Sequence, residues 1–358
     1  MGFKKVIDTY NLMNTYGKLS DQFCVIFVYN DWNDFDNDSH QSECITSNEK
    51  SEITNAFRSI TNFFFPVNGE KEFITSIHTY KERFNYILVY SMAQNTKGIG
   101  RRCLIPLLCE HFGLYNISAD FYPSVLGGNK ELMYNYITNS NIPNISFPET
   151  YFCHHIEEAK LYTDRFINQN KDFIIKPNSE SASIGVSKIS LSTQTIDEIF
   201  IIIQRTFDTY GDFLIQEYIS GKEVEVPVVN IEGKHVSPGV VEILFSDDNE
   251  ILTYDIVASE RYDFTSYNGK LFDSILETAL VCAKILGFSS ICRFDFRLTE
   301  DFAYVIDITP NPTVSSMSST HYMFLQHFLK DNHAVYRLLI MLAIIKYDLF
   351  EPAFNSSI

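Results

Sequence analysis

The chain has 358 residues, of which 45% are apolar and 20% are charged. This length and composition predict a folded protein of two or three lobes and argue against disorder of the whole chain. With 28 basic and 45 acidic residues the formal net charge is −17, so the average field repels nucleic acid and anionic membrane surfaces, and neither is an expected partner. A small anion is still compatible with this charge, because a few placed cations and amides outweigh the mean field locally.

The cysteines and the apolar runs indicate the compartment. The seven cysteines are scattered, odd in number and without a CxxC pair. This pattern predicts reduced thiols in a cytoplasmic protein, not a disulfide framework or a zinc site. No stretch approaches the ~18 uninterrupted apolar residues of a membrane span, and the apolar run 337–350 is expected to form a core helix.

The first part of the chain alternates between strand and helix patterns. The apolar, β-rich runs 23–29 and 85–92 are expected to be buried parallel strands. The segment between them has Ile53, Phe57, Ile60 and Phe64 at helical spacing. A helix ending at Gly113 follows, so the sequence predicts an α/β lobe that closes near residue 117.

The rest of the chain gives mixed α and β signals. A helix is expected over 129–139, and two strands over 172–177 and 184–190 frame a polar loop. A second helix, over 195–207, is expected to share one apolar face among Ile196, Ile199, Phe200 and Ile203. A strand, a turn at Ser220 and Gly221, and an alternating strand follow; then come a helix over 270–288 and a hairpin over 290–309.

Four charged residues near strand ends suggest a binding or catalytic site. Lys176 ends an apolar strand, where it would be desolvated unless an anion meets it. Asp295 lies beside Arg293 in an alternating strand, and Asp307 ends the next strand, so a hairpin would bring two carboxylates and a guanidinium together. Hard oxygen ligands on rigid strands suit Mg²⁺. The alternative is a strand-end lysine that reaches water, a surface Arg–Asp pair and a turn aspartate.

Four motifs follow one another from Phe173 to Ser319: a strand ending in lysine, the loop "KPNSESASIGVSK", the strand "LIQEYISGKE", and the pair "RFDF" and "VIDITPNP". In this order they resemble the ATP-grasp superfamily, most closely its D-alanine:D-alanine ligase-like branch, whose loop commonly reads KPxxEGSSVGVSK. The resemblance implies an α/β fold (α+β ATP-grasp) of three lobes. These are an N-terminal Rossmann-like pre-ATP-grasp domain at 1–117, a central ATP-grasp subdomain at 118–213, and a C-terminal subdomain at 214–358 with the metal site and terminal helices.

Position by position, the resemblance implies an ATP site. Lys130 and Lys176 would hold phosphate oxygens, and Ser183 with neighbouring amides would cover the γ-phosphate. The strand and turn that follow would supply the other nucleotide contacts, with Gln216, Glu217, Tyr218 and Ile219 at the adenine and Glu223 at the ribose hydroxyls.

The resemblance also implies a metal and two substrates. Asp295, Asp307 and Thr309 would bind Mg²⁺. Arg293 would stabilise the negative charge on the tetrahedral oxygen, and Lys176 would share the catalytic role. The second substrate would meet Ser318, which would bind its carboxylate, and Thr313, which stands where the family has a glycine that contributes an oxyanion amide.

Several positions depart from the family pattern. Asp307 and Thr309 stand where the metal pair is usually Glu and Asn. Ser259 replaces a further phosphate lysine, with Arg261 as a conceivable substitute. The N-terminal Glu and His that recognise the first D-alanine have no evident counterparts, which predicts substrates other than D-alanine. The Arg101–Arg102 pair either faces a different carboxylate or begins a solvated helix.

The expected function is therefore ATP-dependent carboxylate–amine ligation through an acyl phosphate, with small-molecule acid and amine substrates of amino-acid type. Two alternatives stay open. The acyl group could pass to the thiol of an acidic carrier protein, or the chain could be a nucleotide-binding module without turnover. A homodimer through the first lobe is implied by the resemblance alone.

Overall fold

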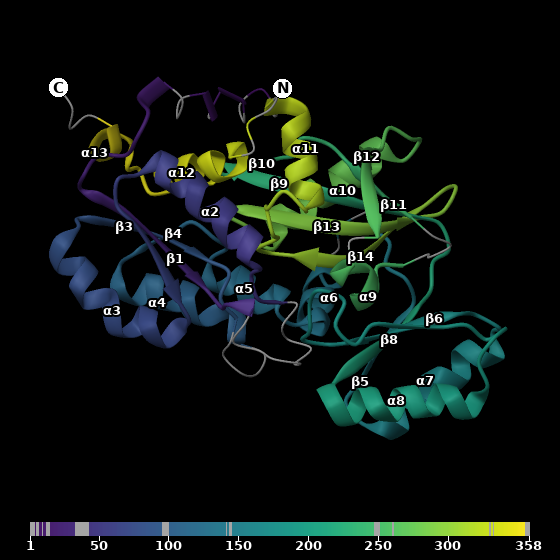
Figure 1. The fold of residues 1–358 in the computed structure, drawn as a ribbon. Coiled ribbons are helices and arrows are strands. Elements are labelled where there is room, and N and C mark those ends of the chain that lie inside the picture. The colour runs from purple at the N-terminus through teal and green to yellow at the C-terminus, as the bar shows by residue number, and fades with distance from the viewer. Residues whose placement is uncertain are drawn as a thin grey trace.

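The computed structural model describes residues 15–32, 43–94, 100–140, 145–246, 251–259, 261–328 and 333–354, together with residues 4, 7, 8, 10, 11, 142 and 331. Three sheets, each with its own helices, meet around a common centre (Figure 1). Within these residues, no helix has the length and apolar character needed to cross a membrane.

The first unit is a four-stranded parallel sheet in the order β2-β1-β3-β4. Its strands are β1 (Phe23–Tyr29), β2 (Phe64–Asn68), β3 (Tyr86–Ser91) and β4 (Tyr115–Asn116). One face packs on α3 (Glu70–Arg83) and α4 (Leu104–Phe112), and the other on α2 (Ser47–Ile60), α12 (Ala334–Lys346) and α13 (Phe350–Phe354). Because helices cover both faces, β1 is buried along its whole length, as its continuous apolar run predicts.

Helix α2 is shorter than the apolar spacing suggests. It begins at a capping box between Thr46 and Glu49 and ends at Ile60. Phe64 was expected on the helix, but it lies in β2 and pairs with Val25 of β1. Helical spacing and strand alternation coincide over so few residues, and the sheet edge beside β1 decides which one forms.

The middle unit is an antiparallel sheet in the order β5-β8-β6-β7. Its elements are β5 (Thr150–Cys153), α7 (Ile156–Asn168), β6 (Phe173–Pro177), β7 (Ser187–Ile189), α8 (Ile196–Tyr210) and β8 (Phe213–Glu217). Helix α8 buries Ile199 and Ile203 against the sheet, whereas Ile196 is 54% exposed and does not share that face as expected. The polar loop predicted from the sequence connects the β6–β7 hairpin.

The third unit is a larger sheet in the order β12-β11-β9-β13-β14, with β10 paired to β9. Its strands are β9 (Lys222–Ile231), β10 (Lys234–Val236), β11 (Val241–Phe245), β12 (Tyr262–Ser266), β13 (Ile291–Leu298) and β14 (Ala303–Thr309). Helices α5 (Phe121–Gly127), α6 (Lys130–Thr138) and α10 (Phe272–Ile285) share its core, while α9 (Tyr254–Ala258) and α11 (Ser319–Phe328) lie at its margins. The short helix η3 (Arg101–Cys103) directly precedes α4 in the first unit.

The sheets divide the chain at points that differ from the expected lobe boundaries. Strand β8 was assigned to the C-terminal lobe, yet it pairs with β5 and β6 in the middle sheet. Helices α5 and α6 were assigned to the central lobe, yet Leu126, Met133 and Ile137 pack in the core of the third unit. The last helices return to the first sheet (Figure 1), so the first and third units share one core cluster.

The turn at Gly221 joins the middle unit to β9 and yields a stability prediction. Gly221 has a φ of 144°, and a Cβ there would lie 1.9 Å from the backbone oxygen of Leu298. We expect Gly221→Ala to lower the free energy of unfolding by about 3 kcal/mol or more, because backbone strain adds to overlap with a fixed carbonyl. Gly233→Ala is the matched control: its φ is 77° but no atom lies within 4 Å, so about 1 kcal/mol is expected. Equal shifts of the two urea midpoints would contradict the argument.

Candidate functional site

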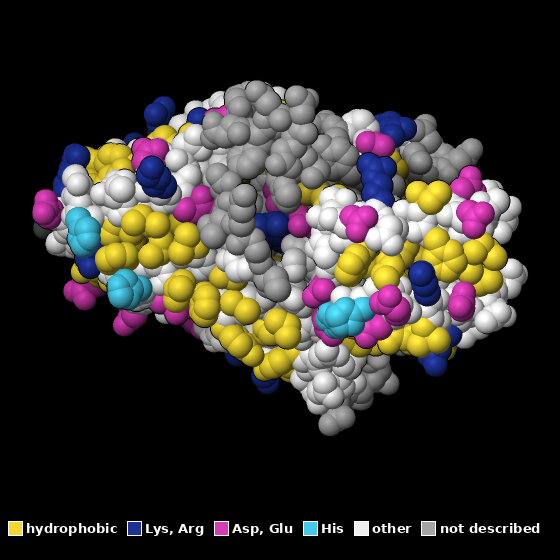
Figure 2. Space-filling view, turned by 90° about the horizontal axis from the view of Figure 1, so that it is seen from below, with side chains coloured by type: hydrophobic (Ala, Val, Ile, Leu, Met, Phe, Trp, Pro, Cys, Tyr) yellow, Lys and Arg dark blue, Asp and Glu magenta, His cyan; other side chains and the backbone are white. Residues whose placement is uncertain are grey.

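A cavity of about 730 Å³ lies where the three units meet. From below, the molecule is hollowed at its centre, and basic and acidic side chains are visible inside the hollow (Figure 2). All of the site residues predicted from the sequence line this one cavity: Lys130, Lys176, Ser183, Gln216, Glu217, Tyr218, Ile219, Glu223, Arg293, Asp295, Asp307, Thr309, Thr313 and Ser318. The fold therefore brings together positions that are up to 188 residues apart in the chain.

Two lysines enter the cavity from different units. Lys176, at the end of β6, donates to Gln216 Oε1 at 3.0 Å and to the backbone oxygen of Ile306 at 3.3 Å. Lys130, at the start of α6, donates to the backbone oxygen of Glu180 at 2.5 Å. Burial lowers the pKa of both ammonium groups. Burial by itself would raise the pKa of Asp307, but these two lysines hold it below its ordinary value.

The loop between β6 and β7 has an unusual backbone. Gly185 has a φ of 70°, a conformation that glycine adopts without strain. Ala182 and Ser183 also have positive φ, at 49° and 57°. Consecutive left-handed residues cost about 1–3 kcal/mol each and collect at ligand sites, where successive amides form a concave anion-binding surface. The loop geometry therefore fits a phosphate cradle.

The strand and turn after the loop form a second wall. Gln216 accepts from Lys176 and donates through Nε2 to Thr150 at 2.9 Å. The Tyr218 ring lies 3.9 Å from the Lys188 ammonium. Glu223 is buried and pairs with Arg297 at 3.5 Å. Burial raises the pKa of Glu223 to about 7, although Arg297 opposes this shift.

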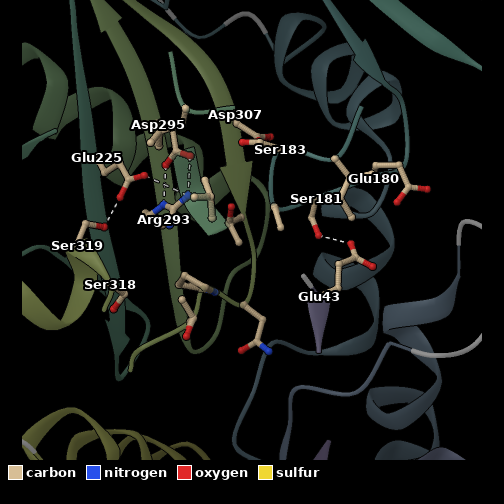
Figure 3. A pocket seen from close by; sticks show the side chains of 18 of the residues that line it. Glu43, Glu180, Ser181, Ser183, Glu225, Arg293, Asp295, Asp307, Ser318 and Ser319 are labelled. Carbon is tan, nitrogen blue, oxygen red and sulfur yellow. Dashed lines mark hydrogen bonds and ion pairs between the residues drawn. The ribbon is translucent and has the colours of Figure 1, made fainter. Parts of the chain in front are cut away.

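Three carboxylates form a row across neighbouring strands of the third sheet. Asp295 on β13 pairs in register with Glu225 on β9 and with Asp307 on β14. Arg293 donates to both oxygens of Asp295, at 2.7 and 2.8 Å, and lies 3.3 Å from Glu225 (Figure 3). Burial raises the pKa of Asp295 to about 7. Like charges directly opposite each other repel, so this row depends on the guanidinium and on nearby cations.

The donor set fits a magnesium ion that is shared with a nucleotide. Asp307 and Thr309 are two residues apart on β14 and share a face with Asp295 across the hairpin. Both oxygens of Asp295 accept from Arg293, but a carboxylate has about four lone-pair positions. In the described residues no group of three His, Cys, Asp or Glu side chains could hold a metal alone. Mg²⁺ bound by one or two carboxylates and substrate phosphates needs no such cage.

A run of hydroxyl groups lines the far end of the cavity. Ser315 Oγ donates to Glu49 at 3.1 Å, and Ser316 donates to Glu52 through its amide at 3.1 Å and its hydroxyl at 2.7 Å. Ser318 Oγ donates to the backbone oxygen of Ser315 at 2.9 Å. Helix α2 of the first unit therefore holds the loop that follows β14. To bind Ser318, a substrate carboxylate would have to replace the backbone oxygen of Ser315 as the acceptor for the Ser318 hydroxyl.

The first unit adds a buried charge network that faces the β6–β7 loop. Arg101 Nη2 donates to Glu43 at 2.8 and 2.9 Å and to Glu180 at 2.8 Å. Arg102 Nη2 donates to Glu43 at 2.7 Å and also contacts Ser181. Glu43 accepts from Ser181 as well (Figure 3). Arg101 is only 8% exposed, so the prediction of a solvated helix start is wrong for this residue.

Sequence reasoning missed five acidic residues of the cavity wall, namely Glu43, Glu49, Glu52, Glu180 and Glu225. Glu225 had a readable signal, because it lies two residues after Glu223 on an alternating strand and so shares its face. Glu49 and Glu52 lie on α2 and meet the serine loop only through tertiary packing. No local pattern marks Glu43.

Comparisons with known proteins point in one direction. A family model described as D-ala D-ala ligase C-terminus matches residues 156–340, just over half of the chain. A D-alanine--D-alanine ligase of Flavobacterium psychrophilum is 26% identical over 204 residues, which cover 56% of this chain and 58% of that protein. One of Flavobacterium johnsoniae is 22% identical over 262 residues, covering 72% and 73%. The first of these matches thus spans less than two thirds of its relative.

Solved structures show the same fold. A D-alanine--D-alanine ligase of Bacillus anthracis complexed with ATP has a TM-score of 0.66 at 16% identity, covering 91% of this chain and 97% of that one. The VanG D-Ala:D-Ser ligase of Enterococcus faecalis has a TM-score of 0.64 at 17% identity, covering 90% and 100%. With these matches beside the cavity geometry, the chain belongs to the D-Ala–D-Ala ligase C-terminus family and has the ATP-grasp fold.

Proposed function

We propose that the protein is an ATP-dependent ligase that joins a carboxylic acid to an amine through an acyl phosphate. One observation carries the proposal: two half-buried lysines, a row of carboxylates and an arginine from separate units line a single cavity. Family membership and the likeness to an ATP-bound ligase support it. The chain spans 58% of the length of the Flavobacterium psychrophilum ligase that it matches.

The nucleotide would lie between the middle and third units. Lys130 and Lys176 would neutralise phosphate oxygens, and the amides around Ser183 would cover the transferring phosphoryl group. Each lysine donates to neutral oxygens of the protein, and a phosphate would supply the counter-charge that burial demands. Gln216, Glu217, Tyr218 and Ile219 would enclose the adenine, and Glu223 would accept from the ribose hydroxyls.

Asp295, Asp307 and Thr309 would hold the magnesium ion. When bound, the ion would supply positive charge at the β- and γ-phosphate oxygens during in-line transfer to the substrate carboxylate. Lys130 and Lys176 keep the pKa of Asp307 below its ordinary value, so this carboxylate would be ionised and able to bind the metal ion. Asp307 and Thr309, which lie two residues apart on β14, would hold the ion through a carboxylate oxygen and a hydroxyl oxygen.

The acyl-transfer step would use Arg293 and the serine loop. Two carboxylates hold the guanidinium of Arg293 in place, so it would meet the developing oxyanion without further reorganisation. The amine would attack from the end lined by Thr313 and Ser318. We propose amino-acid-type substrates other than D-alanine, since the N-terminal Glu and His that recognise the first D-alanine in the family have no evident counterparts in this sequence.

The proposal predicts substrate-dependent ADP and phosphate release. We expect turnover in a matrix of acids crossed with amines to need Mg²⁺ and at least one acid. Lys176→Met and Asp295→Asn should each lower kcat/KM by about 100-fold or more, because each removes charge next to the transferring phosphoryl group.

Lys234→Met is the matched control, since Lys234 is exposed on β10 and does not line the cavity. Full substrate-dependent turnover by Lys176→Met or Asp295→Asn would disprove the site assignment. ATP binding without ADP release for every acid and amine would instead favour the nucleotide-binding module.

The buried state of Glu223 predicts pH-dependent binding of adenosine, a probe with ribose hydroxyls but no phosphate. Burial raises the pKa of Glu223 to about 7, so the carboxyl is mostly protonated at pH 6 and mostly ionised at pH 8. Because ribose hydroxyls donate to the ionised form, adenosine affinity should rise roughly tenfold over this interval. Calorimetric titration measures it. A similar rise with 2′,3′-dideoxyadenosine, or in Glu223→Gln, would contradict the role of Glu223.

A further inference from the structure

Arg102 is a cation of the cavity wall for which the proposed reaction has no role. The basic residues among the described part of the lining are Arg102, Lys130, Lys176, Arg293 and Arg297. The nucleotide and the acyl group engage the lysines and Arg293, and Arg297 is paired with Glu223. Arg261, the conceivable phosphate cation after β11, is exposed and is not part of this lining.

In the part of the chain that the structure describes, two of the three nitrogens of the Arg102 guanidinium, Nε and Nη2, have hydrogen-bond partners. Nε donates to Gln94 Oε1 at 2.6 Å, and Nη2 donates to Glu43 Oε1 at 2.7 Å and contacts Ser181. The described residues place no acceptor on its second terminal nitrogen, Nη1. A planar fork that is already oriented, with donors left over, matches a carboxylate in geometry and charge.

The charges around Arg102 leave room for an anion. Arg101 donates to both Glu43 and Glu180, so these two carboxylates neutralise Arg101 as well as Arg102. Burial lowers the pKa of Arg102, yet an arginine side chain stays protonated in proteins. A partly desolvated guanidinium with unused donors therefore gains from a second anionic partner.

Arg102 lies near the β6–β7 loop, which indicates that the acid substrate, and not the amine, would supply this anion. Its partner Ser181 lies two residues before Ser183, which we place over the transferring phosphoryl group. The acid must put its reacting carboxylate against that group. The neighbouring segment 91–94 of the first unit carries no charge, and Glu43, the carboxylate in contact with Arg102, already accepts from Arg101 and Ser181. A second carboxylate on the same acid would thus meet Arg102.

We propose that Arg102 is a specificity-determining residue that selects an acid substrate with a second carboxylate, such as a short dicarboxylic acid or an acidic amino acid. This inference rests on the proposed ligase function and names the class of its first substrate. The second carboxylate is bound and stays unreacted, so the acyl-phosphate chemistry of the first is unchanged.

The test uses hydroxylamine as the nucleophile, so that the natural amine need not be known. Its nitrogen attacks the acyl-phosphate carbonyl, inorganic phosphate leaves, and the hydroxamate is measured. The acids are glutarate, succinate, glutamate and aspartate, each compared with the monoamide that replaces its second carboxylate. For wild-type protein we expect kcat/KM to be about 100-fold higher for at least one of these acids than for its monoamide, as for loss of a buried charged hydrogen bond.

Arg102→Gln should remove this preference, and the loss should appear mainly as a higher KM for the acid. The KM for ATP and the rate with the monoamide should change by less than about threefold. Arg58→Gln, an exposed arginine of the same unit, is the matched control and should keep the preference. Arg102→Lys, which keeps the charge without the fork, should restore part of it, and unchanged ADP affinity in each variant shows that the nucleotide site is intact.

The outcomes separate the two proposals. Hydroxamate formation by the wild type without preference for a second carboxylate overturns the role of Arg102 alone. A rise in the KM for ATP that is equal for every acid in Arg102→Gln also overturns it, because Arg102 would then contact the phosphoryl group. No hydroxamate from any acid with wild-type protein refutes the ligase function itself, and the inference falls with it.

Discussion

Charge buried around one cavity is the constraint on which this structure depends. Lysines, arginines and carboxylates that are each costly to desolvate line this one cavity. The row of Glu225, Asp295 and Asp307 would repel itself on the sheet. Arg293 between two of its members, and Lys130 and Lys176 near the third, make the arrangement tolerable. The site is therefore a balance of charges, and a bound nucleotide and metal would change that balance.

This balance requires all three units. Lys130 comes from a helix in the core of the third unit, Lys176 from the middle sheet, and Arg102 from the first unit. Backbone contacts fix these units to each other: the amide of Lys130 donates to Asn178 at 3.0 Å, and its side chain reaches Glu180. The C-terminal helices bind the first sheet to β9 through a shared apolar core. The packing between the three units thus sets the distances between the charged side chains that line the cavity.

The two ends of the cavity differ in charge and so would treat their substrates differently. The end beside the β6–β7 loop has Lys130, Lys176 and Arg102, which favour anions. At the other end, the hydroxyls of Ser315 and Ser316 already donate to Glu49 and Glu52. A group that binds there meets oxygen lone pairs and carboxylates, which favours an ammonium group. This difference fits the proposed reaction, in which the acid would bind at the loop end and the amine at the serine end.

The sequence by itself determined the order of the elements, the strand that ends in Lys176 and the β13–β14 hairpin, because period-two alternation and short-range turns are local properties. The motif positions that line the cavity followed from the resemblance to the ATP-grasp superfamily. The sequence alone could not fix the end of α2 at Ile60, since Phe64 fits a helix and a strand equally well until β1 offers an edge. Only the tertiary structure decided that Glu43, Glu49 and Glu52 face the cavity and that Arg101 is buried. These side chains are paired with residues more than fifty positions away, and no local pattern encodes which distant charge will offset the cost of burying them.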